Sequence, residues 1–189
     1  MLNFIPPIKE IYTNNNFSMK EKTPVGKFNL RGDLENKEFT SKAEKILGMI
    51  LPEESCSTSI KEKITCMWLG PNEWLLVSND TIKNESNEYE LEQILFNSIS
   101  KTNLGAVTNV SDHYTVFKLS GSNIFEILSK ACPFDFASEN FGDNKVIQTI
   151  LNHADVTIHK KTKNDVDLYV RRSFSNHLWS WIKDSARFF

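Results

Sequence analysis

Glu73 is the acidic residue whose surroundings most favour chemistry. It lies in the stretch WLGPNEWLLVS, residues 68–78, between a Gly-Pro-Asn turn and an apolar run, directly before Trp74. A carboxylate that is desolvated beside an indole ring acts as a general base when its pKa is raised. The same carboxylate shapes a turn when it accepts hydrogen bonds from backbone amides. We favour the second interpretation, so Gly70, Pro71 and Glu73 are predicted to form a structural turn, and no catalytic residue is assigned.

The other residue types that catalyse reactions or bind metals do not form a recognisable motif. Ser111, Asp112 and His113 are consecutive, and neighbouring residues of a strand point to opposite faces, so they cannot form a hydrolase triad. No two histidines lie four residues apart, no cysteine pair has zinc-site spacing, and no glycine-rich phosphate loop occurs in the sequence. The sequence therefore predicts that this chain by itself binds no flavin, nicotinamide or metal.

The C-terminal region contains the candidates for a partner interface. Arg171 and Arg172 end an apolar strand, where they either bind carboxylates of a partner chain or remain solvated. The helix that follows is predicted to bury a stripe made of Phe174, Leu178, Trp181, Ile182, Ser185 and Phe189. Trp179 lies about 100° or more from the centre of that stripe, near Lys183, and either anchors a partner or packs under a loop. We predict an interface formed by Arg171, Arg172, Trp179 and Lys183.

The composition favours a globular chain in a reducing compartment. The 189 residues are 40% hydrophobic, enough for a core, and the formal net charge of −2 favours neither nucleic acid nor an anionic membrane as a partner. The apolar runs are too short to span a bilayer, and the start of the sequence lacks the pattern of a secretory signal. Cys56, Cys66 and Cys132 are odd in number and form no C-x-x-C pair, which suits reduced thiols. We therefore expect a cytoplasmic protein.

Hydrophobic periodicity and turn residues predict strands and helices in alternation. Strands are expected at 27–32, 64–69, 74–78, 146–151, 156–160 and 166–172, and residues 105–121 are expected to form one long strand or a kinked pair. Helices are expected at 41–52, 87–99, 122–132 and 173–189. Ser41 and Glu44 have the spacing of a capping box for the first helix, and Asn87 is the expected cap of the second.

This order of elements predicts an α+β fold, with helices packed on a mainly antiparallel sheet. Residues 1–24 are polar and are expected to form an N-terminal arm or tail outside the core. Residues 25–189 are expected to form a single globular domain, or two small lobes that share one core.

Four blocks of the sequence, in register, resemble the gamma subunit family of heterotetrameric sarcosine oxidase. The first is the Leu-Gly-Pro-x-Glu-Trp-Leu-Leu block at 69–76, and the second is NVSDHYTVFKLSG, which leads into a Leu-Ser-Gly turn. The third is the hairpin VIQTILNHADVTIHK, and the fourth is RRSFSNHLWSWI. The matches run from Arg31 to the C-terminus. The chain departs from the family pattern at Asn72, Asn109 and Ser175.

The resemblance implies a noncatalytic gamma subunit with a fold similar to the folate-binding domain of the glycine-cleavage T-protein. Its partners would be the alpha, beta and delta subunits of an oxidoreductase complex that converts sarcosine to glycine, hydrogen peroxide and 5,10-methylenetetrahydrofolate. The complex would hold FAD, FMN, NAD, zinc and tetrahydrofolate in those other subunits. In that family no catalytic residue is assigned to the gamma subunit, which agrees with the motif search.

Three other interpretations remain open on the sequence. The chain could belong to a related flavin-dependent complex, such as an N-methylglutamate dehydrogenase, and only the substrate or the neighbouring subunits would separate the two. It could be a free-standing folate-binding protein of the T-protein kind, although those chains are usually longer and have a second domain. A soluble module without flavoprotein partners is the remaining alternative.

Overall fold

The computed structural model describes residues 5–79, 89–138 and 140–189. The chain divides into two compact units, which are described separately. Unit 1 comprises Pro24–Ser111, and unit 2 comprises Ile5–Thr23 together with Asp112–Phe189. Unit 2 is therefore discontinuous in sequence, with unit 1 inserted between its two segments. This arrangement is nearer to the expectation of two lobes than to that of one domain over 25–189.

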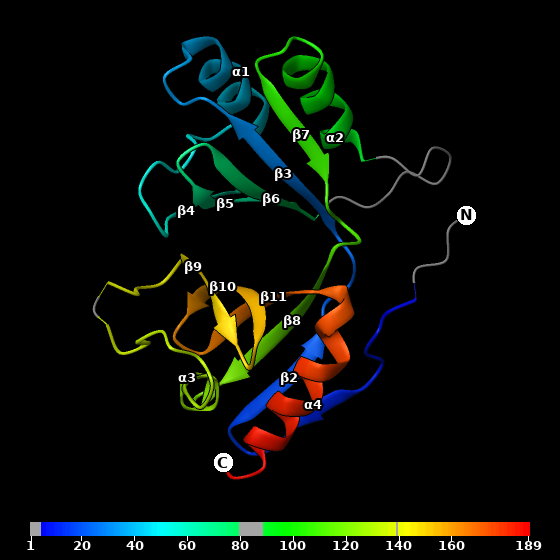
Figure 1. Ribbon diagram of the computed structural model, residues 1–189, viewed down its shortest axis with the longest axis vertical. Coiled ribbons are helices and arrows are strands. Elements are labelled where there is room, and N and C mark those ends of the chain that lie inside the picture. Colours follow the sequence, from blue (N-terminus) through cyan, green and yellow to red (C-terminus); the bar gives the residue numbers. More distant parts are fainter. Residues whose placement is uncertain (1–4, 80–88, 139) are drawn as a thin grey trace. The chain divides into compact units, whose positions relative to one another are not determined.

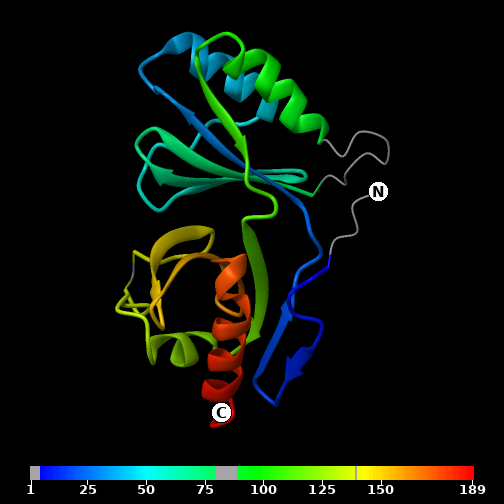
Figure 2. The same ribbon diagram turned by 45° about the vertical axis from the view of Figure 1, so that its right-hand side comes forward.

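Unit 1 is a five-stranded antiparallel sheet with helices on one face (Figures 1 and 2). The strand order is β4-β5-β6-β3-β7. The strands are β3 (Gly26–Gly32), β4 (Thr58–Lys61), β5 (Ile64–Gly70), β6 (Glu73–Ser78) and β7 (Gly105–Asn109). The helices are α1 (Lys37–Leu47) and α2 (Glu90–Leu95), and α2 continues into a π-helical turn, η1 (Phe96–Ser100). The β5–β6 hairpin and strand β3 are confirmed where the sequence predicted them.

The core of unit 1 lies between the sheet and these helices. Phe28 and Leu30 of β3 alternate with polar residues and point to the helix side, as do Trp74 and Leu76 of β6. Phe39 of α1 packs against Trp74 with the ring centroids 5.9 Å apart. All five side chains are fully buried. The four from β3 and β6 face the helices because each strand presents every second residue to the same side.

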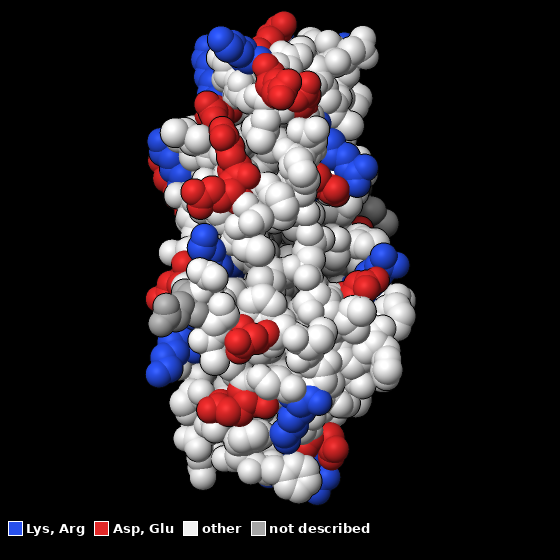
Figure 3. Space-filling view, turned by 60° about the vertical axis from the view of Figure 1, so that its left-hand side comes forward, with Lys and Arg blue, Asp and Glu red and all other residues white. Residues whose placement is uncertain are grey.

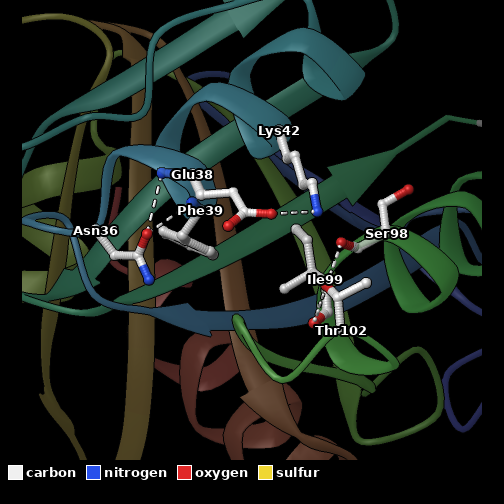
Figure 4. Close-up of polar contacts among 7 residues, drawn as sticks. All are labelled: Asn36, Glu38, Phe39, Lys42, Ser98, Ile99 and Thr102. Carbon is white, nitrogen blue, oxygen red and sulfur yellow. Dashed lines mark hydrogen bonds and ion pairs between the residues drawn. The ribbon is translucent and has the colours of Figure 1, made fainter.

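Helix α1 begins four residues before the expected start. The side chain of Asn36, the N-cap, accepts hydrogen bonds from the backbone N–H groups of Glu38 and Phe39, and Lys42 pairs with Glu38 at 2.8 Å one turn along (Figure 4). An Asn side chain is among the best helix caps because it satisfies N–H groups that have no partner within the helix. The predicted cap at Ser41 is therefore wrong, and Ser41 lies inside the helix.

The π-helical turn η1 places Ile99 in the core while its end stays exposed. The hydroxyl of Thr102 donates to the carbonyls of Ser98, at 2.7 Å, and Ile99, at 3.2 Å, just beyond the helix (Figure 4). These bonds satisfy carbonyls that have no partner within the helix. The expected cap at Asn87 lies outside the described residues.

Unit 2 is a six-stranded antiparallel sheet with α3 and α4 on one face (Figures 1 and 2). The strand order is β1-β2-β8-β11-β10-β9. The strands are β1 (Ile11–Thr13), β2 (Phe17–Glu21), β8 (Tyr114–Gly121), β9 (Lys145–Leu151), β10 (Ala154–Thr162) and β11 (Asp165–Arg171). The helices are α3 (Ile124–Ser129) and α4 (Ser175–Ala186), and a short 3-10 turn, η2 (Arg172–Phe174), leads into α4.

The N-terminal segment corrects the expectation of an arm outside the core. Strand β2 pairs with β8 in the middle of the chain, with Phe17 opposite Gly121 and Met19 opposite Leu119. Phe17 is 2% exposed and Met19 is fully buried, so both belong to the core of unit 2. Residues 17–21 are therefore an integral strand, because their two apolar side chains face the same side of the sheet as those of β8.

The stretch 105–121 forms two strands, as in the kinked-pair alternative. Strand β7 joins the sheet of unit 1 and pairs with β3, whereas β8 joins the sheet of unit 2. The break falls at Val110 to His113. The α+β class with antiparallel pairing is thus confirmed, with two sheets rather than one.

Candidate functional site

The turn at residues 70–73 is built as a hairpin, but not in the way the sequence suggested. Gly70 pairs with Glu73, and the backbone carbonyl of Asn72 accepts a hydrogen bond from the N–H of Gly32 at 3.2 Å. Gly70 does not have a positive φ, so the turn does not use the backbone conformations that only glycine adopts easily. A bulge between Trp68 and Gly70 accommodates the change of register before the turn.

Glu73 holds two side chains of the neighbouring strand rather than backbone amides. Its Oε1 accepts a hydrogen bond from Asn29 Nδ2 at 2.7 Å and one from Arg31 Nη2 at 2.9 Å. Partial burial alone would raise the pKa of the Glu73 carboxyl, but these bonds and the charge of Arg31 lower it below its usual value. A general base needs a raised pKa, so the electrostatics at Glu73 oppose that role.

A surface depression of about 480 Å³ lies beside this turn. Its lining includes Arg31, Gly32, Gly70, Pro71, Gly105 and Ala106. The walls are mainly apolar, and the Arg31–Glu73 pair forms its charged part, with the Arg31 side chain 63% exposed. Apart from Pro71, which lies in the β5–β6 turn, these residues belong to the ends of four strands of unit 1.

Trp179 is part of the core of unit 2, which corrects its expected position off the buried stripe. It is 3% exposed, and its ring meets Phe117 edge to face with the centroids 5.4 Å apart. Its indole N–H donates to a carboxylate oxygen of Glu10 in the N-terminal segment. Trp181, predicted to be inward, is only half-buried. The alternative that Trp179 packs under another segment of its own chain is the one that the structure bears out.

The charged members of the predicted interface have partners within unit 2. Lys183 Nζ lies 3.1 Å from both carboxylate oxygens of Glu10, and Arg171 Nη2 lies 3.7 Å from Asp155 with both side chains largely exposed. Arg172 donates from its guanidinium to the backbone carbonyl of Ile5. Arg172 and Lys183 therefore bind the N-terminal segment of their own unit. Arg171 lies at the surface in a long, exposed ion pair.

The consecutive Ser111, Asp112 and His113 do not meet as a triad. Ser111 Oγ accepts a hydrogen bond from the backbone N–H of Lys27 at 2.9 Å in unit 1. In unit 2, the His113 ring stacks edge to face on Tyr114, with the centroids 4.5 Å apart. The side chains of Ser111 and His113 are thus each engaged by a neighbour in their own unit. The three residues lie in the break between β7 and β8 rather than in a strand, so the strand geometry assumed from the sequence does not apply here.

Sequence analysis missed a buried ionic cluster on the sheet of unit 2. Asp167 is 2% exposed and pairs with Lys22 at 2.9 Å and with Lys161 at 2.7 Å. Burial alone would raise the pKa of the Asp167 carboxyl, but the two lysines lower it below its usual value. His159, opposite Asp167 on β10, is 1% exposed. Its burial, opposed by the charge of Asp167, lowers its pKa to about 4, so the ring is neutral near pH 7.

Metal-ligating side chains do not gather in the parts of the chain that the structure describes. Within residues 5–79, 89–138 and 140–189 there is no group of three or more His, Cys, Asp or Glu side chains placed to hold a metal ion. In the same ranges, no helix is both long enough and apolar enough to cross a bilayer. Charges of both signs are interspersed over the face drawn in Figure 3.

The fold and the side-chain contacts define an α+β protein of two antiparallel sheets, each covered by helices on one face. Residues 31–187 match the family model described as "Sarcosine oxidase, gamma subunit family". This match covers most of the chain and includes parts of both units. The chain belongs to the sarcosine oxidase gamma subunit family.

Individual relatives agree with the family match. The chain is 28% identical over 124 residues to the sarcosine oxidase subunit gamma of Corynebacterium sp. (strain P-1), which covers 66% of this chain and 57% of that protein. It is 27% identical over 140 residues to the subunit gamma of Arthrobacter sp., covering 74% of this chain and 65% of that protein. The matched parts therefore span less than two thirds of the length of these relatives.

A solved structure shows the same fold. A chain of the heterotetrameric sarcosine oxidase from Corynebacterium sp. U-96, solved in complex with pyrrole 2-carboxylate, superposes with a TM-score of 0.80 at 23% identity. The superposition covers 89% of this chain and 83% of that chain. At this identity the likeness shows the fold alone.

Proposed function

We propose that this chain is the gamma subunit of a heterotetrameric sarcosine oxidase and that its role is assembly rather than catalysis. The observation that carries the proposal is the family match over residues 31–187, which includes strands of both sheets. A segment that matched only one unit would support a shared module, whereas a match through both supports a shared role.

The contacts of the reactive residues support a structural role. Glu73 binds Asn29 and Arg31, and its pKa is lowered. His159 is buried and neutral, and Ser111 binds the backbone of Lys27. Side chains that are held in this way are positioned to stabilise strands. A proton transfer group would instead be placed to reach a substrate.

The proposed partners are the alpha, beta and delta subunits, with FAD, FMN, NAD, zinc and tetrahydrofolate held by those subunits. The proposed reaction of the complex is the oxidation of sarcosine to glycine with formation of hydrogen peroxide and 5,10-methylenetetrahydrofolate. Such a complex would be cytoplasmic. The role of this chain would be to complete the assembly in which the flavin subunits are stable and active.

The test is purification of the tagged chain from cells that express all four subunits. We expect stoichiometric flavoprotein subunits, a flavin absorption spectrum and peroxide formation with sarcosine. Peroxide or dye reduction with N-methylglutamate, and none with sarcosine, would instead assign the chain to a related dehydrogenase. A chain that purifies without flavoprotein partners under these conditions would overturn the proposal.

A further inference from the structure

Three glycines line the depression beside residues 70–73, and they differ in whether the packing would tolerate a side chain in their place. A Cβ at Gly32 would lie 2.2 Å from a ring carbon of Phe39, and a Cβ at Gly105 would lie 2.2 Å from the backbone oxygen of Arg31. Neither position has room for a side chain, because the contact distances are far below those of real Cβ atoms. The packing of unit 1 therefore requires glycine at both positions.

The packing does not require glycine at position 70. A Cβ there would meet only the Cβ of Glu73 within 4 Å, at the ordinary contact distance of 3.8 Å, and the backbone does not have a positive φ. Glycine in a strand carries an entropic cost relative to alanine. A side chain at this position would extend into the open space of the depression that Gly70 lines. The absence of a side chain at Gly70 therefore keeps the depression open.

Arg31 is oriented at the edge of the depression with part of its guanidinium group available. Nε donates to Asn29 Oδ1 at 3.1 Å, and Nη2 donates to Glu73 Oε1 at 2.9 Å. Nη1 has no hydrogen-bond acceptor among the described residues. Because two bonds already fix the plane of the group, a carboxylate that binds Nη1 would lose little side-chain entropy from Arg31.

The surface is better suited to a protein loop than to a small molecule. Small-molecule sites enclose their ligand and aim several buried polar groups at it. Here the charged groups lie at the surface, with the Arg31 side chain 63% and the Glu73 side chain 31% exposed. The rest of the lining is Asn72, three glycines, Pro71 and Ala106. The Gly32–Asn72 hydrogen bond joins the end of β3 to the β5–β6 turn. A shallow, mainly apolar surface with one oriented guanidinium group fits an apolar side chain beside an acidic one.

We propose that the depression over Gly70 binds a loop of a partner subunit, in which an apolar side chain covers Gly70 and Ala106 and a neighbouring Asp or Glu pairs with Arg31. This inference rests on the proposed function, because it names the surface by which the chain joins its complex. The loop would add its carboxylate to a guanidinium that Asn29 and Glu73 already orient.

The experiment compares Gly70→Leu with Gly142→Leu in cells that express the full set of subunits. Gly142 is the matched control, because a Cβ there meets nothing within 4 Å, so a side chain has room as it does at position 70, and Gly142 lies outside the depression. We expect both variants to melt within a few degrees of the wild type, and only Gly70→Leu to weaken co-purification of the flavoprotein subunits, by roughly tenfold or more. Arg31→Met is expected to weaken it further in the same direction.

Two further measurements keep the test decisive. If Gly70→Leu melts early, the smaller Gly70→Ser replaces it, and a photo-crosslinking residue at Ala106 is expected to capture a partner subunit in the assembled complex. A normal complex with a folded Gly70→Leu or Gly70→Ser variant, or no crosslink from position 106, overturns the inference. A normal complex without a crosslink from position 106 is also the result expected if a small carboxylic acid, rather than a partner loop, occupies the depression. A wild-type chain that recruits no flavoprotein subunit overturns the proposed function instead, so the two failures are distinguishable.

Discussion

The indole N–H of Trp179 donates to the carboxylate of Glu10, a residue 169 positions earlier in the chain. Lys183, one turn further along α4, binds the same carboxylate. The bonds from Trp179 and Lys183, assisted by the charge of Lys183, lower the pKa of Glu10. The N-terminal segment therefore serves as the partner of Trp179, in place of the other subunit that the sequence suggested.

Replacing Trp179 by Ala should destabilise the isolated chain by ~3 kcal/mol or more, because it removes a buried ring that packs on Phe117. Replacing the half-buried Trp181 should cost about 1 kcal/mol. This order is the reverse of what the helical stripe suggested. Urea denaturation of the two variants measures the difference, and a smaller loss for Trp179→Ala than for Trp181→Ala would contradict the packing described.

Replacing Glu73 by Gln should lower stability at neutral pH by ~1 kcal/mol at most, since the bond from Asn29 can persist while the charge that binds Arg31 is lost. The folded pKa of Glu73 is lowered, so its contribution is full above the unfolded value near 4.5 and disappears as the pH falls through the folded pKa. The wild type and the variant should therefore converge in acid. Peroxide formation by the assembled complex should be nearly unchanged, and a large loss of turnover with intact assembly would make Glu73 catalytic.

His159 should make the protein less stable as the pH falls from about 6.5 to about 4. The folded pKa is about 4 and the unfolded pKa about 6.5, so the unfolded chain binds the extra proton in that window. The loss is roughly 3 kcal/mol for a shift of this size. A His159→Leu variant should show a flatter curve in chemical denaturation measured across this range. Equal slopes for the two proteins would show that the ring is not held neutral.

Replacing Asp167 by Asn should destabilise unit 2 by ~3 kcal/mol or more, because Lys22 and Lys161 would lose the carboxylate that compensates their charges. Asp165 is the control on the same strand. It pairs with Lys118 at 3.3 Å with about a third of its side chain exposed, so Asp165→Asn should cost under ~1 kcal/mol. Thermal melting of both variants provides the comparison, and similar melting points would refute the structural role of Asp167.

Gly105→Ala should destabilise unit 1 by ~2 kcal/mol, because the new methyl group would collide with the backbone of Arg31. Gly70→Ala should change stability by no more than ~0.5 kcal/mol, since the methyl group has room. The pair tests the packing of the isolated chain without any partner. Comparable losses in chemical denaturation would mean that Gly70 is also required by the fold.

The β5–β6 hairpin was predictable because its determinants are local. Apolar residues run along both arms, and Gly70 and Pro71 separate them at the length of a tight turn. Strand β2 was missed for the opposite reason. Its sequence, FSMKE, has only Phe17 and Met19 as apolar residues, and its partner β8 lies about a hundred residues later in the chain. Local pattern cannot show a pairing over that distance.

The position of Trp179 was mistaken because the helical phase was set by residues outside the helix. Phe174 and Phe189 flank α4 rather than belong to it, and Phe174 is 40% exposed. The buried side of α4 includes the small residues Ser175 and Ala186, which let the helix approach its neighbours closely. A hydrophobicity stripe gives such residues little weight, and the N-terminal cover of Trp179 is invisible to it.

The ionic cluster around Asp167 could not be inferred from strand β11 alone. An Asp side chain is usually exposed to solvent, and Lys22 lies 145 residues away from Asp167 in the sequence. The depression beside residues 70–73 could not be predicted from the sequence for the same reason. Its lining comes from separate stretches near 31, 70 and 105, and only the fold shows that Gly70 alone of these glycines has space for a side chain.

The insertion of unit 1 within unit 2 has a consequence for the order of synthesis. Strand β2 leaves the ribosome before unit 1, but its hydrogen-bonding partner β8 emerges only after residues 24–111 of unit 1 have been made. Until then the nascent chain carries Phe17 and Met19 on a strand that can pair with β1 but has an open edge on the β8 side, and an open edge is a template for pairing with the wrong chain. Unit 1 completes its own sheet only shortly before β8 is made, because β7 directly precedes β8 in the chain. Slow translation through residues 24–111 would thus lengthen the period of risk for a segment that lies entirely upstream.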